Sequence, residues 1–118
     1  KATIEGPLIC EMPPSATNLA NGDDIPVTTA CVNVDANGSA RTDIRMSTTN
    51  AVAGQFITVI NTGGESLTFN NTESTCKVRG INANKDTIRA GEAHLFVYDG
   101  SLWNHVGGGA SDEWMTAG

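Results

Sequence analysis

Two histidines and three aromatic residues lie close together in a chain that has few of either. Residues 95–109 read LFVYDGSLWNHVGGG, and His94 directly precedes them. The 118 residues include only 2 histidines, 2 Trp, 1 Tyr and 3 Phe. An Asp-Gly pair between apolar segments favours a hairpin with a two-residue turn, here at Asp99 and Gly100. The residues best suited to chemistry are therefore expected on one β-hairpin.

Pairing outward from this turn predicts the two faces of the hairpin. The expected pairs are Tyr98 with Ser101, Val97 with Leu102, Phe96 with Trp103, Leu95 with Asn104, and His94 with His105. Two histidines on facing strands can share a metal ion, with further ligands from another strand or subunit. Neutral imidazoles at a rim or an interface are the favoured alternative. We therefore expect no metal site and no cofactor.

The two faces of the predicted hairpin differ in chemistry. One face carries the histidines with Phe96, Tyr98 and Trp103, and we expect it to meet a second sheet or a neighbouring subunit. The other face carries aliphatic residues, Leu95, Val97, Leu102 and Val106, and we expect it to seal the core.

No catalytic motif accompanies these residues. The chain contains no GxSxG, P-loop, HExxH or dinucleotide-binding fingerprint. Its aspartates lie mostly at turns, where their side chains cap backbone N–H groups. A carboxylate pair for glycoside hydrolysis is set by fold geometry rather than by spacing, so the alternative of a small polysaccharide-degrading enzyme stays open at this point. The favoured prediction is a protein that is not an enzyme.

Three cysteines, Cys10, Cys31 and Cys76, are far apart and form no CxxC pair. Free cysteines are commonly buried as small apolar residues, and this is the favoured interpretation of all three. A Cys10–Cys31 disulfide requires the first two strands to be neighbours. None of the three is expected to be catalytic, because neither histidine lies near them in the sequence.

The elements that must position these residues are short β-strands. Apolar and β-branched runs separated by turn residues occupy 27–34, 40–46, 55–61, 65–70, 76–81, 86–90, 93–98 and 101–106. Turn signals recur every 8 to 12 residues, a spacing typical of sandwiches and barrels. The sequence predicts an all-β fold: an antiparallel, jelly-roll-like β-sandwich or barrel of about eight or nine strands.

Both ends of the chain differ from this central domain. Residues 1–26 are predicted to form an extended N-terminal arm and a proline-rich loop, followed by the β-sandwich at 27–108 and a flexible C-terminal tail at 109–118. Apolar residues on these ends could anchor in grooves of a partner. The candidates are Ile4, Leu8 and Ile9 in the arm, and Trp114 and Met115 in the tail.

Charge and hydrophobicity argue against two classes of partner. The formal net charge is −6, and the 7 basic residues are scattered along the chain, whereas nucleic-acid binding needs a concentrated basic patch. No apolar run approaches the ~20 residues that span a bilayer. We expect neither nucleic acid nor membrane as a partner.

Residues 54–108 resemble a module of tailed-bacteriophage virion structural proteins. The resemblance lies in ITVINTGG, SLTFNN, RAGEA and the closing hairpin FVYDGSLWNHVG. The same module is found in tail-fibre, tailspike and head-fibre segments and in small capsid decoration, or cement, proteins. A chain of this length, with an arm, is most similar to the decoration proteins.

The resemblance implies a capsid-stabilising function without catalysis. A decoration protein is commonly a homotrimer on the outer capsid surface of the virion, where it binds the major capsid protein and bridges its subunits. The interface candidates would be the arm and tail residues above together with Phe96, Tyr98 and Trp103. The alternative is a tail-fibre or head-fibre module that binds a host-surface receptor or carbohydrate, with the three aromatics stacking on sugars.

Overall fold

A computed structural model describes residues 13, 15–83 and 85–108. Its strands form a six-stranded sheet, in the order β1-β3-β5-β9-β10-β7, and a four-stranded sheet, in the order β2-β4-β6-β8. The strands are β1 (Thr17–Asn18), β2 (Asp24–Ile25), β3 (Cys31–Asp35), β4 (Arg41–Met46), β5 (Phe56–Asn61), β6 (Leu67–Phe69), β7 (Val78–Arg79), β8 (Thr87–Ile88), β9 (Ala93–Tyr98) and β10 (Trp103–Gly108), and the short helix α1 covers Glu73–Cys76. The two sheets face each other as a sandwich. The all-β prediction is confirmed.

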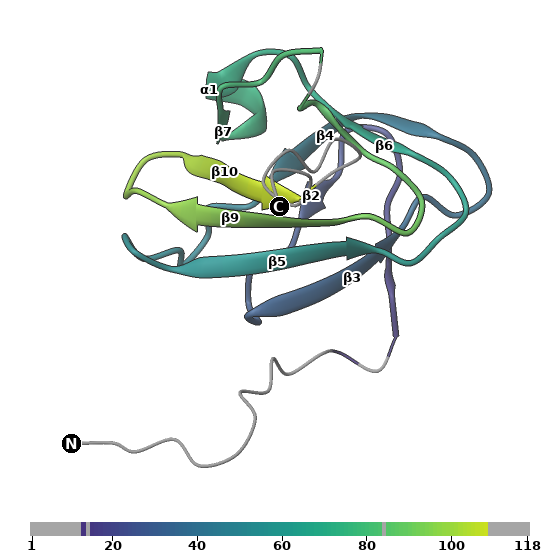
Figure 1. Ribbon diagram of the computed structural model, residues 1–118, viewed down its shortest axis with the longest axis horizontal. Coiled ribbons are helices and arrows are strands. Elements are labelled where there is room, and N and C mark those ends of the chain that lie inside the picture. The colour runs from purple at the N-terminus through teal and green to yellow at the C-terminus, as the bar shows by residue number, and fades with distance from the viewer. Residues whose placement is uncertain (1–12, 14, 84, 109–118) are drawn as a thin grey trace, which may run out of the picture.

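The first six strands wind between the two sheets instead of forming hairpins. Odd-numbered strands enter the six-stranded sheet and even-numbered strands enter the four-stranded sheet. Within each sheet the successive strands are parallel: β1 with β3, β3 with β5, β2 with β4, and β4 with β6. The chain therefore makes three stacked, solenoid-like turns (Figure 1).

This winding corrects the predicted antiparallel, jelly-roll-like pairing. The turn between β3 and β4, for example, has the composition of a hairpin turn, with Asn37 and Gly38 both at positive φ and the Asn37 N–H donating to Asp35 Oδ1 at 2.7 Å. It nevertheless joins strands of different sheets. Turn residues determine how sharply the chain bends, whereas the sheet that the next strand enters depends on packing across the core.

Antiparallel pairing appears only in the second half of the domain. Strand β8 runs antiparallel to β6, and β9 runs antiparallel to both β5 and β10. Strands β3, β5, β9 and β10 lie side by side in Figure 1, with α1 and β7 beside the end of the sheet. The β9–β10 hairpin thus continues the sheet that the solenoid-like turns begin.

The core fills the space between the sheets. Its largest fully buried side chains are Trp103, Phe96, Ile25, Ile44, Met46, Ile57, Leu67 and Ile88. Leu19 and Ile25 belong to this core, and β1 and β2 pair with β3 and β4. The described part of the segment assigned to the arm, up to residue 26, is therefore integrated in the sandwich. Within the described residues, no helix is long and apolar enough to cross a membrane.

Candidate functional site

The β9–β10 hairpin has a longer turn than its sequence predicts. Tyr98 pairs with Trp103 rather than with Ser101, so residues 99–102 make the turn. The cause is the Asp99 side chain, whose Oδ1 accepts hydrogen bonds from the backbone N–H groups of Ser101 and Leu102, both at 2.9 Å. A shift of two residues leaves the paired side chains on their predicted faces, whereas Leu102 falls within the turn. The grouping of residues into two faces is therefore correct, although their pairing is not.

The aromatic face of the hairpin lies inside the sandwich. Phe96 and Trp103 are completely buried and Tyr98 is 8% exposed. The Trp103 Nε1–H donates to the Ser47 carbonyl at 2.8 Å, and Phe96 packs edge-on against Phe69 of the opposite sheet. The aromatic face was expected to meet either a second sheet or a neighbouring subunit, and the structure shows it packed against the second sheet. These three side chains are consequently not available on the surface of the domain.

The aliphatic face of the hairpin is the outer face, and the prediction that it seals the core is wrong. Leu95 and Val97 are only partly buried, and Val106 is 53% exposed. Both faces are apolar, so periodicity alone does not decide which is inside. The larger aromatic area, with a hydrogen-bond partner for the indole N–H, occupies the core.

The two histidines contact each other, as predicted. His94 Nδ1 and His105 Nε2 are 2.8 Å apart and share a hydrogen bond, and His94 Nε2 lies 3.1 Å from Glu92 Oε1. Burial, with smaller effects from His94 and Lys85, lowers the pKa of His105 to about 4. Among the described residues, no three His, Cys, Asp or Glu side chains are grouped so as to hold a metal ion. The pair forms a hydrogen-bonded chain at the margin of the core.

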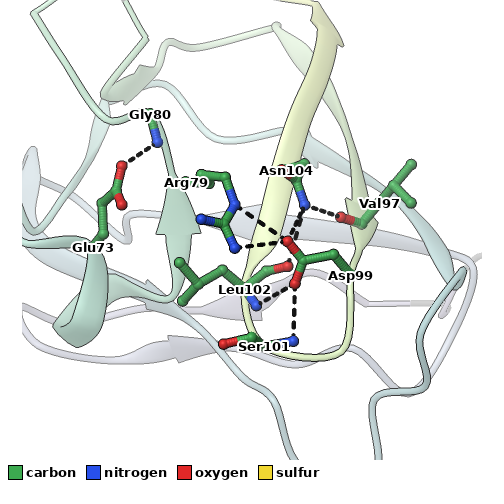
Figure 2. A network of polar contacts seen from close by, with 8 residues as sticks. All are labelled: Glu73, Arg79, Gly80, Val97, Asp99, Ser101, Leu102 and Asn104. Carbon is green, nitrogen blue, oxygen red and sulfur yellow. Dashed lines mark hydrogen bonds and ion pairs between the residues drawn. The ribbon is translucent and has the colours of Figure 1, made fainter.

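A second polar network fixes the hairpin turn to its neighbouring strand. Figure 2 shows Asp99 Oδ2 between Arg79 of β7, at 2.8 Å, and the Asn104 amide, at 2.9 Å. The backbone N–H of Leu102, then the side-chain amide of Asn104, the backbone N–H of Ser101 and Arg79, hold the pKa of Asp99 well below its usual range. This carboxylate has its hydrogen bonds committed to the fold, and the arrangement is that of a structural clamp.

The outer face of the six-stranded sheet carries an unusual surface. Phe56 pairs with Val97 across β5 and β9, and Val106 occupies a bulge in the adjacent β10. Phe56 is 59% exposed and Val106 is 53% exposed. We define the outer patch as Phe56, Val97 and Val106 with their partly buried neighbours Ile60 and Leu95. Exposed apolar side chains grouped on a sheet face are typical of a surface that packs against another protein.

No pattern in the sequence identifies Phe56 as a site residue. The segment QFITVIN is apolar at both strand phases, and Ile57 and Val59 turn out to be the buried ones. Phe56 is the single aromatic residue of this strand and could have drawn attention. The alternation of residues does not show whether its side chain points into the core or to the surface. The remaining interface candidates, Ile4, Leu8, Ile9, Trp114 and Met115, lie outside the described residues.

The cysteines do not share one state. Cys31 is disulfide-bonded, which differs from the expectation of three buried thiols. Cys76 is free and fully buried in the core. Cys10 lies outside the described residues.

Fold and surface together define a two-sheet β module with an apolar outer patch. Residues 15–104 match the family model described as the phage depolymerase C-terminal beta sandwich domain. Because the match covers well over half of the chain, the chain belongs to this family. It is a β-sandwich module of a bacteriophage virion structural protein, and this is the part of the predicted resemblance that is confirmed.

Other known proteins add little to this assignment. No curated protein matches the chain. A solved structure described as "Structure of a chaperone-substrate complex" is similar, with a TM-score of 0.47 and 21% identity. The similarity covers 80% of this chain and 16% of that chain.

Proposed function

We propose that this domain is a non-catalytic structural module of a tail-fibre or tailspike-type phage protein, which packs against another virion polypeptide through the outer patch. The observation that carries the proposal is the exposure of Phe56 on β5 and of Val106 at the bulge of β10, on either side of β9, which carries Leu95 and Val97. The family match over residues 15–104 supports the virion context.

The family match supports this location better than the capsid decoration expected from the sequence. The family takes its name from the C-terminal domain of phage depolymerases, which favours the fibre and spike class over a cement protein. The partner that we propose first is therefore a polypeptide of the fibre or spike itself. The major capsid protein becomes the second candidate.

The chemistry of the outer patch favours a protein partner over a carbohydrate. Sugar recognition uses exposed aromatic rings with polar groups beside them. Phe96, Tyr98 and Trp103 are buried, and Phe56 is the exposed aromatic among the described residues. The other side chains of the outer patch are aliphatic, and Thr58 is the polar residue between Phe56 and Ile60 on β5.

A homotrimer is the assembly that we propose for this patch. In a closed cyclic assembly all interfaces between copies are the same. The outer patch of each copy is therefore covered by a neighbouring copy. Full burial of a Val or Phe side chain contributes roughly 1.5–3 kcal/mol, which offsets part of the entropic cost of association. Repetition around the axis multiplies this effect.

Removing the apolar side chains of the outer patch tests the proposal. The double variant Phe56→Ser, Val106→Ser should reduce the mass from trimer to monomer in light scattering after size exclusion, with an unchanged far-UV spectrum. Val52→Ser is the matched control, since Val52 is 66% exposed but lies in the loop before β5, outside the outer patch. Equal dissociation of the control, or a double variant that stays trimeric, would contradict the proposal. A monomeric wild-type chain would overturn the homotrimer.

Copy number separates the two virion locations. Quantitative mass spectrometry of purified particles should find the parent polypeptide in a few copies per virion if it belongs to a fibre or spike. A copy number comparable with that of the major capsid protein would instead support decoration of the shell.

A further inference from the structure

Two Asn-Gly pairs lie in turns of this domain, and their surroundings differ. The first is Asn21-Gly22, in the turn before β2, and the second is Asn37-Gly38, in the turn between β3 and β4. In such a pair the backbone nitrogen of the glycine can attack the side-chain carbonyl carbon of the asparagine, because glycine has no Cβ to block the approach. Whether this attack occurs in the folded protein depends on how firmly the turn holds the two reacting groups.

The turn at Asn21-Gly22 holds both reacting groups. Asn21 Oδ1 accepts a hydrogen bond from the Thr42 N–H at 2.9 Å, and the Gly22 N–H donates to the Thr42 carbonyl at 3.2 Å. A Cβ placed at Gly22 would lie 3.5 Å from Asp43 Oδ2, so the space beside the backbone is also occupied. The attack at this pair therefore requires two hydrogen bonds to β4 to break first.

The turn at Asn37-Gly38 leaves the same two groups unoccupied. Among the contacts of the described residues, neither the Asn37 side-chain amide nor the Gly38 N–H has a hydrogen-bond partner. Both residues are exposed, and no atom lies within 4 Å of the position that a Cβ would take at Gly38. The turn is held instead through the backbone of Asn37, whose N–H donates to Asp35 Oδ1 and whose carbonyl accepts from Arg41 Nη2. The attack at this pair requires no hydrogen bond of the reacting groups to break.

We propose that Asn37 is a site of spontaneous deamidation, and that the fold protects Asn21 from the same reaction. The Gly38 nitrogen bonds to Cγ of Asn37, the Cγ–Nδ2 bond breaks, and the proton of the Gly38 nitrogen passes to the departing group, which leaves as ammonia. A water molecule then adds to one of the two carbonyls of the resulting five-membered imide and opens the ring. Opening at one C–N bond gives an aspartate, and opening at the other gives an isoaspartate. Water is the co-reactant of the whole sequence.

The product adds a negative charge to a turn that is already charged. The formal net charge of −6 becomes more negative by one unit. Arg41 lies beside the new carboxylate in the turn, where its Nε and Nη2 donate to the carbonyls of Ala36 and Asn37 at 2.6 and 2.9 Å. Because Arg41 holds the backbone of the turn from β4, the strands on either side should keep their pairing. The product is therefore expected to be a folded, more acidic form of the protein.

Peptide mapping of the full chain during incubation in mildly alkaline buffer tests the site. In the folded protein, aspartate and isoaspartate should accumulate at position 37 at least about ten times faster than at position 21, because the attack at Asn21 first breaks two hydrogen bonds. The chain unfolded in urea is the control, since both Asn-Gly pairs should then react at similar rates. Similar rates at the two positions in the folded protein would overturn the proposal. So would an Asn37 that stays unmodified in the folded protein while the unfolded chain reacts.

Ion-exchange chromatography tests the assignment with two matched variants. Asn37→Gly accepts the positive φ of 60° at this position and lacks the side-chain amide, so the acidic form should not appear over the same period. Asn21→Gly lacks the other amide and should yield the acidic form at the wild-type rate. Far-UV circular dichroism of both variants checks that they fold. An acidic form that persists in Asn37→Gly, or that is lost in Asn21→Gly, would show that the modified residue lies elsewhere.

Discussion

The two sheets of this domain present opposite chemistries to their surroundings. The outer face of the six-stranded sheet bears the apolar outer patch. The outer face of the four-stranded sheet bears polar side chains that contact one another: Arg45 and Asn70 bind Asp43 at 3.1 and 2.6 Å, and Thr68 lies 3.2 Å from Thr87. Hydrogen bonds from Asn70 and then Arg45 lower the pKa of Asp43.

This difference supports the proposal that the module associates through its six-stranded sheet. A polar face whose groups bind one another is stable in water and gains little from a protein partner. An apolar face gains by being covered. One sandwich can thus pack on its neighbour through the six-stranded sheet while the four-stranded sheet faces solvent.

The largest expected effect concerns the core that separates these faces. Trp103→Ala should lower the free energy of unfolding by about 3–5 kcal/mol, because it opens a cavity between the sheets and leaves the Ser47 carbonyl without its donor. Chemical denaturation followed by far-UV circular dichroism measures this loss. A stability equal to that of the wild-type protein would show that Trp103 is a surface residue, as the carbohydrate alternative required.

A smaller effect concerns the histidine pair at the margin of the core. His105 has a pKa of about 4 when folded and an ordinary value of 6.5 when unfolded, so between these values the unfolded chain binds a proton that the folded chain does not. Stability should therefore fall as the pH drops from 6.5 to 4, and this group should add no further loss below that. We expect a loss of about 1–3 kcal/mol, the lower end allowing for solvent screening.

Denaturation curves at several pH values measure this dependence. His105→Gln should flatten the curve between pH 6.5 and 4, whereas the lowered pKa of Asp99 should cause a loss of stability mainly below pH 4. A variant with the same slope as the wild-type protein would place the acid sensitivity elsewhere.

The sequence predicted the strands and the composition of the two hairpin faces well. Asp99-Gly100 marked the turn, and the spacing of His94 and His105 predicted their contact, because both features depend on residues close along the chain. The solenoid-like winding was not predicted, because a turn such as Asn37-Gly38 has the same residues whether the next strand pairs with the last one or crosses to the other sheet.

The outer patch was missed for a related reason. Strand β5 is apolar on both phases, and only packing across the sandwich decides that Ile57 is buried and Phe56 is not. The disulfide at Cys31 likewise depends on the position of a distant segment. Local patterns therefore predicted the elements, and the site depended on how those elements pack.

Labelling of the assembled fibre or spike tests the central claim most directly. Phe56→Cys and Thr68→Cys place a thiol on the outer patch and on the opposite polar face, each in a background where Cys76 is buried and unreactive. We predict that maleimide labels both variants in the isolated, dissociated domain. In the assembled protein it should label only the Thr68→Cys variant. Equal labelling of the two variants after assembly would contradict the claim that the outer patch is the docking surface.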